Sequence, residues 1–337
     1  MSLTTASQAI LDAAAQLEAG ELVAFPTETV YGLGADAENP AAVAKIYAAK
    51  GRPQDHPVIV HVAPGADLDY WAADVPDEAR QLAQAFWPGP LTMIVKRNAH
   101  IPDAVSGGQD TVGIRCPSHP VAQALLSAFK GGKGGVAAPS ANKFGNVSPT
   151  TAQHVLDEFG PDAMTVLEGG SSDVGIESTI VDLSRLATHG PVLLRPGHIT
   201  AAQIAAVIGA LPAAPDQAAP RASGTLESHY APKAPVALAD TARLAGLVTT
   251  LAARGRRVAL IHYSPLLTQA AAHHPLPADP AGYAYGLYAA LRAMDRADVE
   301  LILVETPPQD DSWLGINDRL RRAAFGSAGV IDRFLQS

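Results

Sequence analysis

The sequence is poor in cysteine and in charge. Its 337 residues include one cysteine, Cys116, and 17% are charged. A single cysteine excludes an internal disulfide and fits a reducing compartment such as the cytosol. No apolar run approaches the roughly 20 residues that a membrane span needs, and the first residues show no basic signal-peptide region. We therefore expect a cytoplasmic globular protein, whose hydrophobic content of 47% suits a sizeable core.

Several catalytic and cofactor signatures are also absent. The sequence shows no Ser-His-Asp ordering, no His-Glu-x-x-His motif and no cysteine cluster. The glycine-rich run 130–135 lacks the Gly-Lys-Ser/Thr ending of a phosphate-binding P-loop, and no G-x-G-x-x-G opens the C-terminal part. His273 and His274 lack metal-ligand spacing, so we predict that they lie in a solvated loop.

Basic residues are scarce in the first part of the chain. Residues 1–211 hold 12 Lys and Arg against 21 Asp and Glu, a net charge of −9, whereas residues 212–337 hold 12 of each. Such an acidic surface is unsuited to nonspecific nucleic-acid binding. The few cations would have to converge on one cavity to bind an anionic ligand.

The length and the hydrophobic pattern predict two domains, residues 1–211 and 236–337. The second alternates strands and helices, which is typical of a small parallel, Rossmann-like α/β domain. Residues 212–235 contain five prolines, and we interpret them as a stiff interdomain linker. The linker also contains His229 and Tyr230, which a passive tether does not need.

A rigid basic corner lies between a predicted helix that ends at residue 49 and a predicted strand over 58–60. Prolines on both sides of the corner exclude a helix from it. The helix therefore delivers Lys50 and Arg52 at its C-terminal end, with His56 close by. Cations held in this way suit an anion that must be kept still, although a solvated basic turn would contain the same residues.

Cations and hydroxyls recur at the ends of other predicted strands. In an open α/β sheet, ligands bind outside such ends. A site rich in cations and hydroxyls but without a nucleophile suits phosphate binding, with catalysis by orientation and charge neutralisation. The residues of this pattern are Lys50, Arg52, Arg115, Ser140, Asn142 and Arg195, with Thr27, Thr29, Thr111 and Ser178 as further hydrogen-bond donors.

Two further segments are predicted to face a ligand. Residues 26–34 are interpreted as a loop that crosses a sheet edge and presents hydroxyls and backbone N–H groups. Ser148 and Pro149 are predicted as the N-cap and first residue of a helix through residue 159, whose N-terminus would offer a phosphate seat. A structural turn and simple helix capping would explain the same residues.

Four motifs together resemble the YrdC-like threonylcarbamoyl-AMP synthase family in its two-domain form. The resemblance covers nearly the whole chain. It implies an α/β fold with a twisted mixed sheet around a deep, electropositive cavity, followed by a smaller parallel α/β domain. The motifs are P-T-E-T-V-Y-G-L-G at 26–34, K-G-R-P and H-P-V-I-V-H within 50–61, P-S-A-N at 139–142 with S-P-T at 148–150, and S-H-Y-A-P-K-A-P at 228–235.

The resemblance implies a nucleotidyltransferase that forms threonylcarbamoyl-AMP and pyrophosphate from L-threonine, bicarbonate and ATP. The product would pass to a tRNA threonylcarbamoyl transferase for the synthesis of threonylcarbamoyladenosine in tRNA. Mg²⁺ would be carried with ATP, because no carboxylate cluster is apparent in the sequence. Neither direct tRNA binding nor membrane association is expected.

The resemblance also implies a role for each site residue. Arg115 would act as a bidentate fork for the threonine carboxylate, and Tyr230 would reach back from the linker and close the cavity. The implied catalytic residues are Lys50, Arg52, Ser140 and Asn142. The implied ATP ligands are Arg52, His56, Thr111, Ala138, Ser140, Ser148, Arg195 and Tyr230. The implied threonine ligands are Thr29, His61, Arg115 and Ser178.

Two other functions stay open at this point. One is an RNA-binding module of the same fold, which salt-dependent binding of tRNA would indicate. The other is an ATP-dependent carbamoyl or phosphoryl transferase with a different acceptor, which release of ADP and phosphate would indicate.

Overall fold

The computed structural model describes residues 3–265 and 270–336, which form two compact units. The first unit runs to Phe144 and continues over Pro149–Thr225. The second unit consists of Gly145–Ser148 and the residues from Leu226 onward. The Pro-rich segment 212–235 is therefore divided between the units rather than forming a separate piece.

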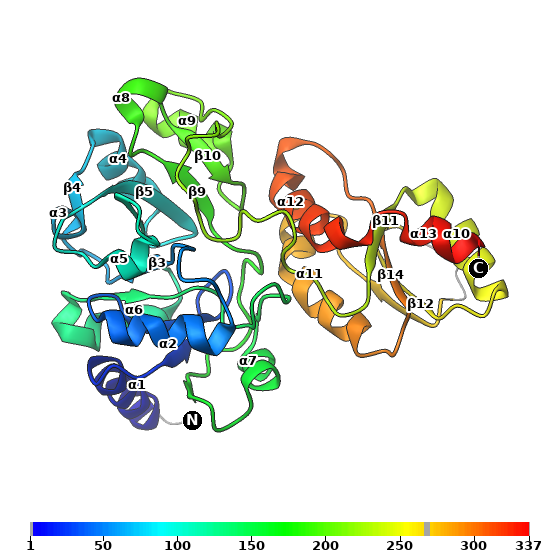
Figure 1. Cartoon of the computed structure of the whole chain (residues 1–337), viewed down its shortest axis with the longest axis horizontal. Helices are drawn as coiled ribbons and strands as arrows, with labels where there is room; N and C mark the ends of the chain where they lie inside the picture. Colours follow the sequence, from blue (N-terminus) through cyan, green and yellow to red (C-terminus); the bar gives the residue numbers. More distant parts are fainter. Residues whose placement is uncertain (1–2, 266–269, 337) are drawn as a thin grey trace. The chain divides into compact units, whose positions relative to one another are not determined.

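The first unit is built on a ten-stranded mixed sheet (Figure 1) with the order β10-β9-β5-β6-β3-β7-β2-β1-β8, while β4 pairs with β5. The pairs β3–β6, β5–β9 and β1–β8 are parallel, and the other pairs are antiparallel. This confirms the expected mixed sheet. The strands are β1 Val23–Phe25, β2 Gly32–Asp36, β3 Ile59–Val62, β4 Ala72–Asp74, β5 Leu91–Arg97, β6 Thr111–Arg115, β7 Gly135–Ala137, β8 Thr165–Val166, β9 Thr179–Asp182 and β10 Val192–Arg195.

Helices surround this sheet. Within residues 3–265 and 270–336, no helix combines the length and the hydropathy that crossing a membrane requires. The helices of the first unit are α1 Leu3–Glu18, α2 Pro40–Lys50, α3 Leu68–Trp71, α4 Asp77–Phe86, α5 Asp103–Ser106, α6 Pro120–Ala128, α7 Ala152–Phe159, α8 Leu186–His189 and α9 Ala201–Ile208, with a 3-10 turn at Phe129–Gly132.

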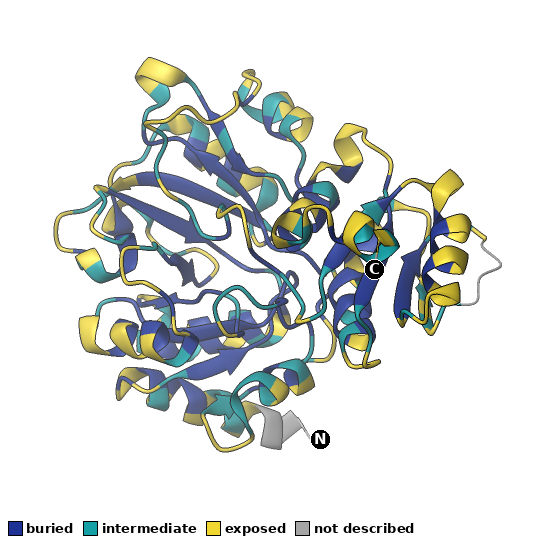
Figure 2. Cartoon of the chain, turned by 45° about the vertical axis from the view of Figure 1, so that its right-hand side comes forward, coloured by how far each residue is buried: buried dark blue, intermediate teal, exposed yellow. Residues whose placement is uncertain are grey.

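The two faces of the sheet pack differently because successive side chains of a strand point to opposite faces. On one face, Val60 and Ile114 pack with residues of α2, α4 and α9 in the main core. On the other, α1 and α6 cover the β1 end, while Ile59, Ile94 and Ile180 form a smaller cluster with part of segment 212–225. We call this second face the α1 face. Figure 2 shows the buried strands and the one-sided burial of the helices.

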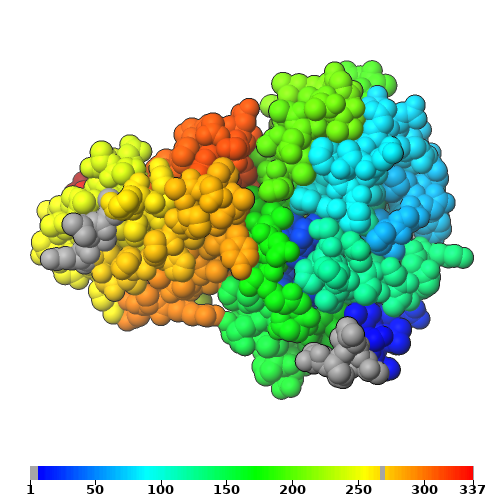
Figure 3. Space-filling view, turned by 180° about the vertical axis from the view of Figure 1, so that it is seen from behind, coloured from blue at the N-terminus to red at the C-terminus, as the bar shows by residue number. Residues whose placement is uncertain are grey.

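The second unit is a small parallel α/β fold, which confirms the prediction for this part of the chain. Its four strands are all parallel and lie in the order β11-β14-β12-β13. The space-filling view shows the strands and helices of this unit, which follow residue 235, in yellow to red (Figure 3). The elements are β11 Val236–Ala239, α10 Thr241–Ala253, β12 Val258–His262, β13 Ala272–Pro275, α11 Pro280–Asp295, β14 Leu301–Glu305, α12 Leu314–Ala324 and α13 Val330–Gln336, with 3-10 turns at Asp311–Trp313 and Phe325–Ser327.

Two predicted loops are wrong in part. The loop over 26–34 is shorter than expected, because β2 begins at Gly32, which pairs with Phe25. His273 and His274 lie in β13 and not in a solvated loop, since this short edge strand pairs with β12. Its sequence lacks the β-branched residues that indicate a strand, so only pairing with β12 reveals it.

The predicted N-cap of α7 is also wrong. Thr151 caps the helix, because its side chain accepts a hydrogen bond from the His154 N–H at 3.2 Å. The helix begins at Ala152, so Ser148 and Pro149 lie outside it. Ser and Thr are both good N-caps, and residues 148–151 contain Ser148, Thr150 and Thr151.

Candidate active site

Helix α2 positions the basic corner as its sequence predicts. The Asn39 side chain accepts hydrogen bonds from the N–H groups of Ala41 and Ala42, which caps the N-terminus. Gly51 ends the helix in the left-handed region with φ 65°. Because this turn follows Lys50 directly, the chain leaves the helix sharply and brings Arg52 to the same corner.

Lys50 holds the turn that carries two other predicted catalytic residues. Its buried Nζ donates to the carbonyl oxygens of Ser140 at 2.6 Å and Asn142 at 2.5 Å. Burial, and secondarily the nearby Arg52 charge, holds the pKa of Lys50 well below its ordinary value. Both contacts are to backbone carbonyls, so Lys50 positions this turn whichever protonation state it takes.

Arg52 and Arg195 meet at one residue of the Pro-rich segment. Arg52 Nη2 donates to the Pro57 carbonyl at 2.8 Å and lies 3.5 Å from the Ser223 hydroxyl. Arg195, the last residue of β10, donates from Nη1 to the Ser223 carbonyl at 2.8 Å. The two predicted phosphate-binding arginines therefore converge, although 142 intervening residues separate them in the sequence.

Segment 212–225 is held against the rest of the first unit at several points. The Gln109 and Arg221 residues exchange two hydrogen bonds, from Gln109 Nε2 to the Arg221 carbonyl and from the Arg221 N–H to Gln109 Oε1. Ala213 forms an isolated bridge with Val192. No local pattern of the sequence indicates these anchors, because the proline content of the segment predicts only an extended chain.

Arg115, at the end of β6, lies in a buried polar cluster. It donates to the Thr29 hydroxyl at 2.9 Å, to the Glu28 carboxylate at 2.5 Å and to the Gly89 carbonyl at 3.3 Å. A guanidinium has five N–H donors, so donors remain for a substrate carboxylate. Glu28 was not predicted as a site residue, because its partner lies 87 residues away and no local pattern identifies such a pair.

His61 is the neighbour of Arg115 across the parallel pair β3–β6. Burial, and secondarily the Arg115 charge, lowers the pKa of His61 to about 3. The imidazole is therefore neutral near pH 7, with one donor and one acceptor nitrogen. Its Nδ1 is buried and has no hydrogen-bond partner in the described part of the chain, so it can serve a ligand.

Gly113 has no side chain to fill the space on the α1 face between the predicted ATP and threonine regions. A Cβ at this position would meet Ile94 Cδ1 at 3.0 Å and Ile59 Cγ1 at 3.6 Å. Thr111 and Arg115, two residues away on either side, share this face because side chains alternate along β6. The four residue steps from Thr111 to Arg115 span about 13 Å. Thr111, a predicted ATP ligand, and Arg115, a predicted threonine ligand, therefore lie at opposite ends of β6.

The remaining predicted ligands of the first unit adjoin this region. The Ala138 N–H donates to the Ile59 carbonyl at 2.9 Å, which fixes the backbone after β7. The His56 ring lies 5.5 Å from the Phe144 ring, and burial followed by the Arg52 charge lowers the pKa of His56. Ser178 lies beside Arg195, whose Nη2 donates to its hydroxyl at 3.1 Å.

Two predicted ATP ligands, Ser148 and Tyr230, belong to the second unit. Arg292 of α11 donates to the Val147 carbonyl next to Ser148. Tyr230 has a left-handed φ of 59°, and its ring centre lies 5.7 Å from both the Tyr288 ring centre and the Arg319 guanidinium. The ATP-binding roles of Ser148 and Tyr230 stay predictions, as do the roles of the other site residues.

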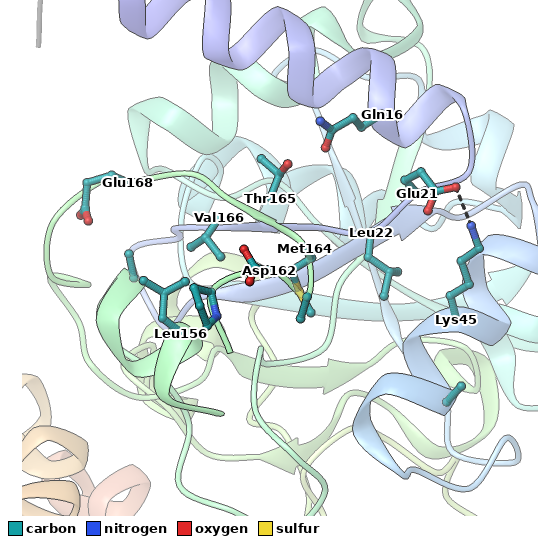
Figure 4. Close-up of a pocket in the computed structure, with 14 residues that line it drawn as sticks. Gln16, Glu21, Leu22, Lys45, Leu156, Asp162, Met164, Thr165, Val166 and Glu168 are labelled. Carbon is teal, nitrogen blue, oxygen red and sulfur yellow. Dashed lines mark hydrogen bonds and ion pairs between the residues drawn. The ribbon is translucent and has the colours of Figure 1, made fainter. Parts of the chain in front are cut away.

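One hollow of the first unit lies away from these residues. It has a volume of about 1030 Å³ and lies between α1, α2 and the α7–β8 segment (Figure 4). Apolar side chains such as Leu22 and Met164 line it, and a Lys45–Glu21 ion pair lies at its rim. It contains none of the predicted site residues, so we assign the chemistry to the convergent polar groups and not to this groove.

The chemistry of the convergent groups is that of an anion-binding site. Burial raises the pKa of the Cys116 thiol to about 11, which does not suit a nucleophile at neutral pH. Within residues 3–265 and 270–336, no group of three or more His, Cys, Asp or Glu side chains is arranged to hold a metal ion. The groups that converge are arginines, a lysine, hydroxyls and a neutral imidazole.

Comparisons with known proteins cover nearly the whole chain. A family profile described as "Telomere recombination", labelled Sua5_yciO_yrdC, matches residues 15–197. A second, described as "Threonylcarbamoyl-AMP synthase, C-terminal domain", matches residues 199–325. The chain is 40% identical to the threonylcarbamoyl-AMP synthase of Bacillus subtilis, over 96% of this chain and 95% of the relative. It is 38% identical to that of Pyrococcus abyssi, over 93% of each chain.

A solved structure agrees with these matches. The crystal structure of P. abyssi Sua5 complexed with L-threonine superposes with a TM-score of 0.86 at 36% identity, covering 94% of both chains. Identity and coverage at this level extend over both units. The chain therefore belongs to the Sua5/YrdC family of threonylcarbamoyl-AMP synthases.

Proposed function

We propose that this chain is a threonylcarbamoyl-AMP synthase that forms threonylcarbamoyl-adenylate and pyrophosphate from L-threonine, bicarbonate and ATP. The convergence of Arg52 and Arg195 at Ser223, together with the Arg115 cluster at the end of β6, carries the proposal. It supports a site for two anionic reactants. The reaction is a nucleotidyl transfer, and its product serves threonylcarbamoyladenosine synthesis in tRNA.

The proposed chemistry depends on charge and orientation. N-carboxy-threonine is an anion that attacks the α-phosphate of another anion, so the site must offset their repulsion. Arg52 and Arg195 would neutralise the phosphates, and Arg115 would hold the threonine carboxylate. Lys50 would act through the Ser140–Asn142 turn that it holds, because its Nζ contacts the carbonyls of that turn. Burial of these groups strengthens each electrostatic contact.

The remaining ligands follow from the family motifs. His56, Thr111, Ala138 and Ser140 of the first unit would line the nucleotide, together with Ser148 and Tyr230 of the second. Thr29, His61 and Ser178 would complete the threonine site with Arg115.

The gathered cations and hydroxyls are not a ligand set for Mg²⁺, which prefers oxygen anions. The ion would therefore be held by the ATP phosphates themselves. The product, a labile mixed anhydride, would pass to a tRNA threonylcarbamoyl transferase in the cytoplasm.

Pyrophosphate release from ATP tests this function directly. We expect release to require both L-threonine and bicarbonate, and to be lost in Arg52→Ala while the unfolding transition of that variant stays close to that of the wild type. Release of ADP and phosphate, or turnover without threonine, would instead identify another ATP-dependent transferase. Undiminished turnover in Arg52→Ala would contradict the phosphate-binding role of Arg52.

A further inference from the structure

Thr92 is a buried hydroxyl that the proposed chemistry does not yet use. It lies on β5, where it pairs with Ile180 of β9, and it is fully buried. Its Oγ1 lies 2.8 Å from the Ser178 Oγ. Among the described residues, this is the one hydrogen-bond partner of the Thr92 hydroxyl, and Ser178 is a proposed threonine ligand.

Ser178 also contacts Arg195. Arg195 donates from Nη2 to the Ser178 Oγ at 3.1 Å and from Nε to the Ser178 carbonyl at 3.0 Å. A guanidinium has donors and no acceptor, so the Ser178 oxygen must be the acceptor in the first of these bonds. One of its two acceptor positions is therefore occupied by Arg195.

The second contact of Ser178 can run in either direction, and the surroundings decide between them. If Ser178 donated to Thr92, the Thr92 proton would be left inside the sheet without an acceptor. The Thr92 methyl group lies near Ile94 and Ile59 over Gly113, and among the described residues the Thr92 hydroxyl has no partner besides Ser178 that could accept that proton. If Thr92 donates, the unused proton belongs to Ser178, where a bound substrate can accept it. Only this second arrangement leaves no buried donor unsatisfied once the site is filled.

We propose that Thr92 is a positioning residue for the threonine site. Together with Arg195 it fills both acceptor positions of the Ser178 oxygen, so that the Ser178 hydroxyl acts toward the substrate as a donor. Ser178 then selects an acceptor, such as a carboxylate, carbamate or hydroxyl oxygen of the threonyl moiety, and rejects the ammonium group. The inference rests on the proposed function, because it takes Ser178 as a threonine ligand.

Thr92→Val tests the inference, since it removes the hydroxyl and keeps the shape of the side chain. We expect the KM for L-threonine to rise about five- to tenfold, the effect of one lost hydrogen bond, while the KM for ATP changes less than about twofold. Thr92→Ser restores the donor and should recover most of the threonine affinity. A purely structural role would instead lower the unfolding temperature and leave the ratio of the two KM values unchanged.

A double-mutant cycle with Ser178→Ala makes the test specific. Without the Ser178 hydroxyl, Thr92→Val should cause no further loss of threonine use. Additive effects, or equal losses for ATP and threonine, would overturn the inference. If Thr92→Val does not fold, Thr92→Ala removes the same hydroxyl with a smaller side chain, and an unchanged KM for threonine in that variant would also overturn the inference.

Calorimetric binding of L-threonine to the full chain separates this inference from the proposed function. A wild-type chain that neither binds threonine nor releases pyrophosphate would contradict the proposed function. A wild-type chain that binds threonine, together with a Thr92→Val variant that binds it equally well, would contradict only the role of Thr92.

Discussion

The carboxylate of Glu28 constrains what Arg115 can contribute to a substrate site. The pair is almost fully buried, and the Ser118 N–H donates to the second Glu28 oxygen at 3.0 Å. Thr29 and the Gly89 carbonyl hold the guanidinium from two further directions. The Arg115 guanidinium is thus held in one orientation before a ligand arrives. This lowers the entropic cost of binding the ligand.

Arg115→Lys should impair threonine use far more than ATP use. A lysine cannot form the bidentate fork and cannot reach Thr29, Glu28 and Gly89 together. We expect the KM for threonine to rise at least about tenfold, with a change of about twofold or less for ATP. Steady-state kinetics in which each substrate is varied would measure both values. Equal losses for the two substrates would place Arg115 elsewhere in the mechanism.

The depressed pKa of His61 has a consequence for stability. The folded state keeps the imidazole neutral, whereas the unfolded chain binds a proton below about pH 6.5. Stability is therefore lost as the pH falls from about 6.5 toward about 3, by up to about 1.4 kcal/mol per pH unit.

His61→Gln should remove this part of the acid sensitivity. Denaturant unfolding at several pH values would show the difference in unfolding free energy between wild type and variant shrinking as the pH falls from 6.5. The exposed residue His198 offers a matched control, since His198→Gln leaves the buried imidazole in place. A pH-independent difference between wild type and His61→Gln would contradict a neutral, buried His61.

At the scale of elements, helix α2 and its C-terminal glycine set the position of Arg52. Gly51 has φ 65°, and an added Cβ would meet nothing within 4 Å. Gly51→Ala therefore introduces backbone strain without a clash, at a cost of about 1 kcal/mol. Strain at this turn should move Arg52 and raise the KM for ATP more than that for threonine.

Gly209 provides the control for this prediction. It ends α9 with φ 72°, also in open space, and has no predicted role in the site. Gly209→Ala should lower the unfolding temperature by a similar amount and leave the KM for ATP unchanged. A parallel effect of the two variants on ATP use would mean that lost stability, and not the position of Arg52, causes the change.

The boundaries of several elements follow from local chemistry that the sequence displays. The end of α2 near residue 49, the short strand that follows the basic corner and the alternation of strands and helices in the second unit agree with their predictions. Capping, side-chain alternation and proline stiffness act within a few residues, which is why they can be predicted. The edge strand β13 and the N-cap of α7 could not, because pairing and competition between neighbouring caps decide them.

At the scale of the whole molecule, the charge distribution argues against a nucleic-acid surface. The acidic residues of 1–211 outnumber the basic ones by 21 to 12. The buried cations Arg52, Arg115 and Arg195 face protein groups. We expect no gel shift with tRNA at physiological salt. A shift that weakens steeply as salt rises would contradict this expectation and support an RNA-binding function.

The sequence by itself determined which chemistry the chain carries. The evidence for this chemistry is local in the sequence, because each feature involves only residues close together in the chain. These features are the lone cysteine, the missing nucleophile motifs, the strand-end cations and the four family motifs. They were sufficient to predict the mixed sheet, the parallel second unit and the substrates.

Only the tertiary structure decided which groups meet. Glu28 and Arg115 are 87 residues apart, and Thr92 and Ser178 are 86 apart. Ser223 joins Arg52 and Arg195 from a segment whose composition indicates nothing more than an extended chain. Such contacts depend on strand order and on the face to which each side chain points. These properties arise from packing the whole chain and leave no trace in any local pattern.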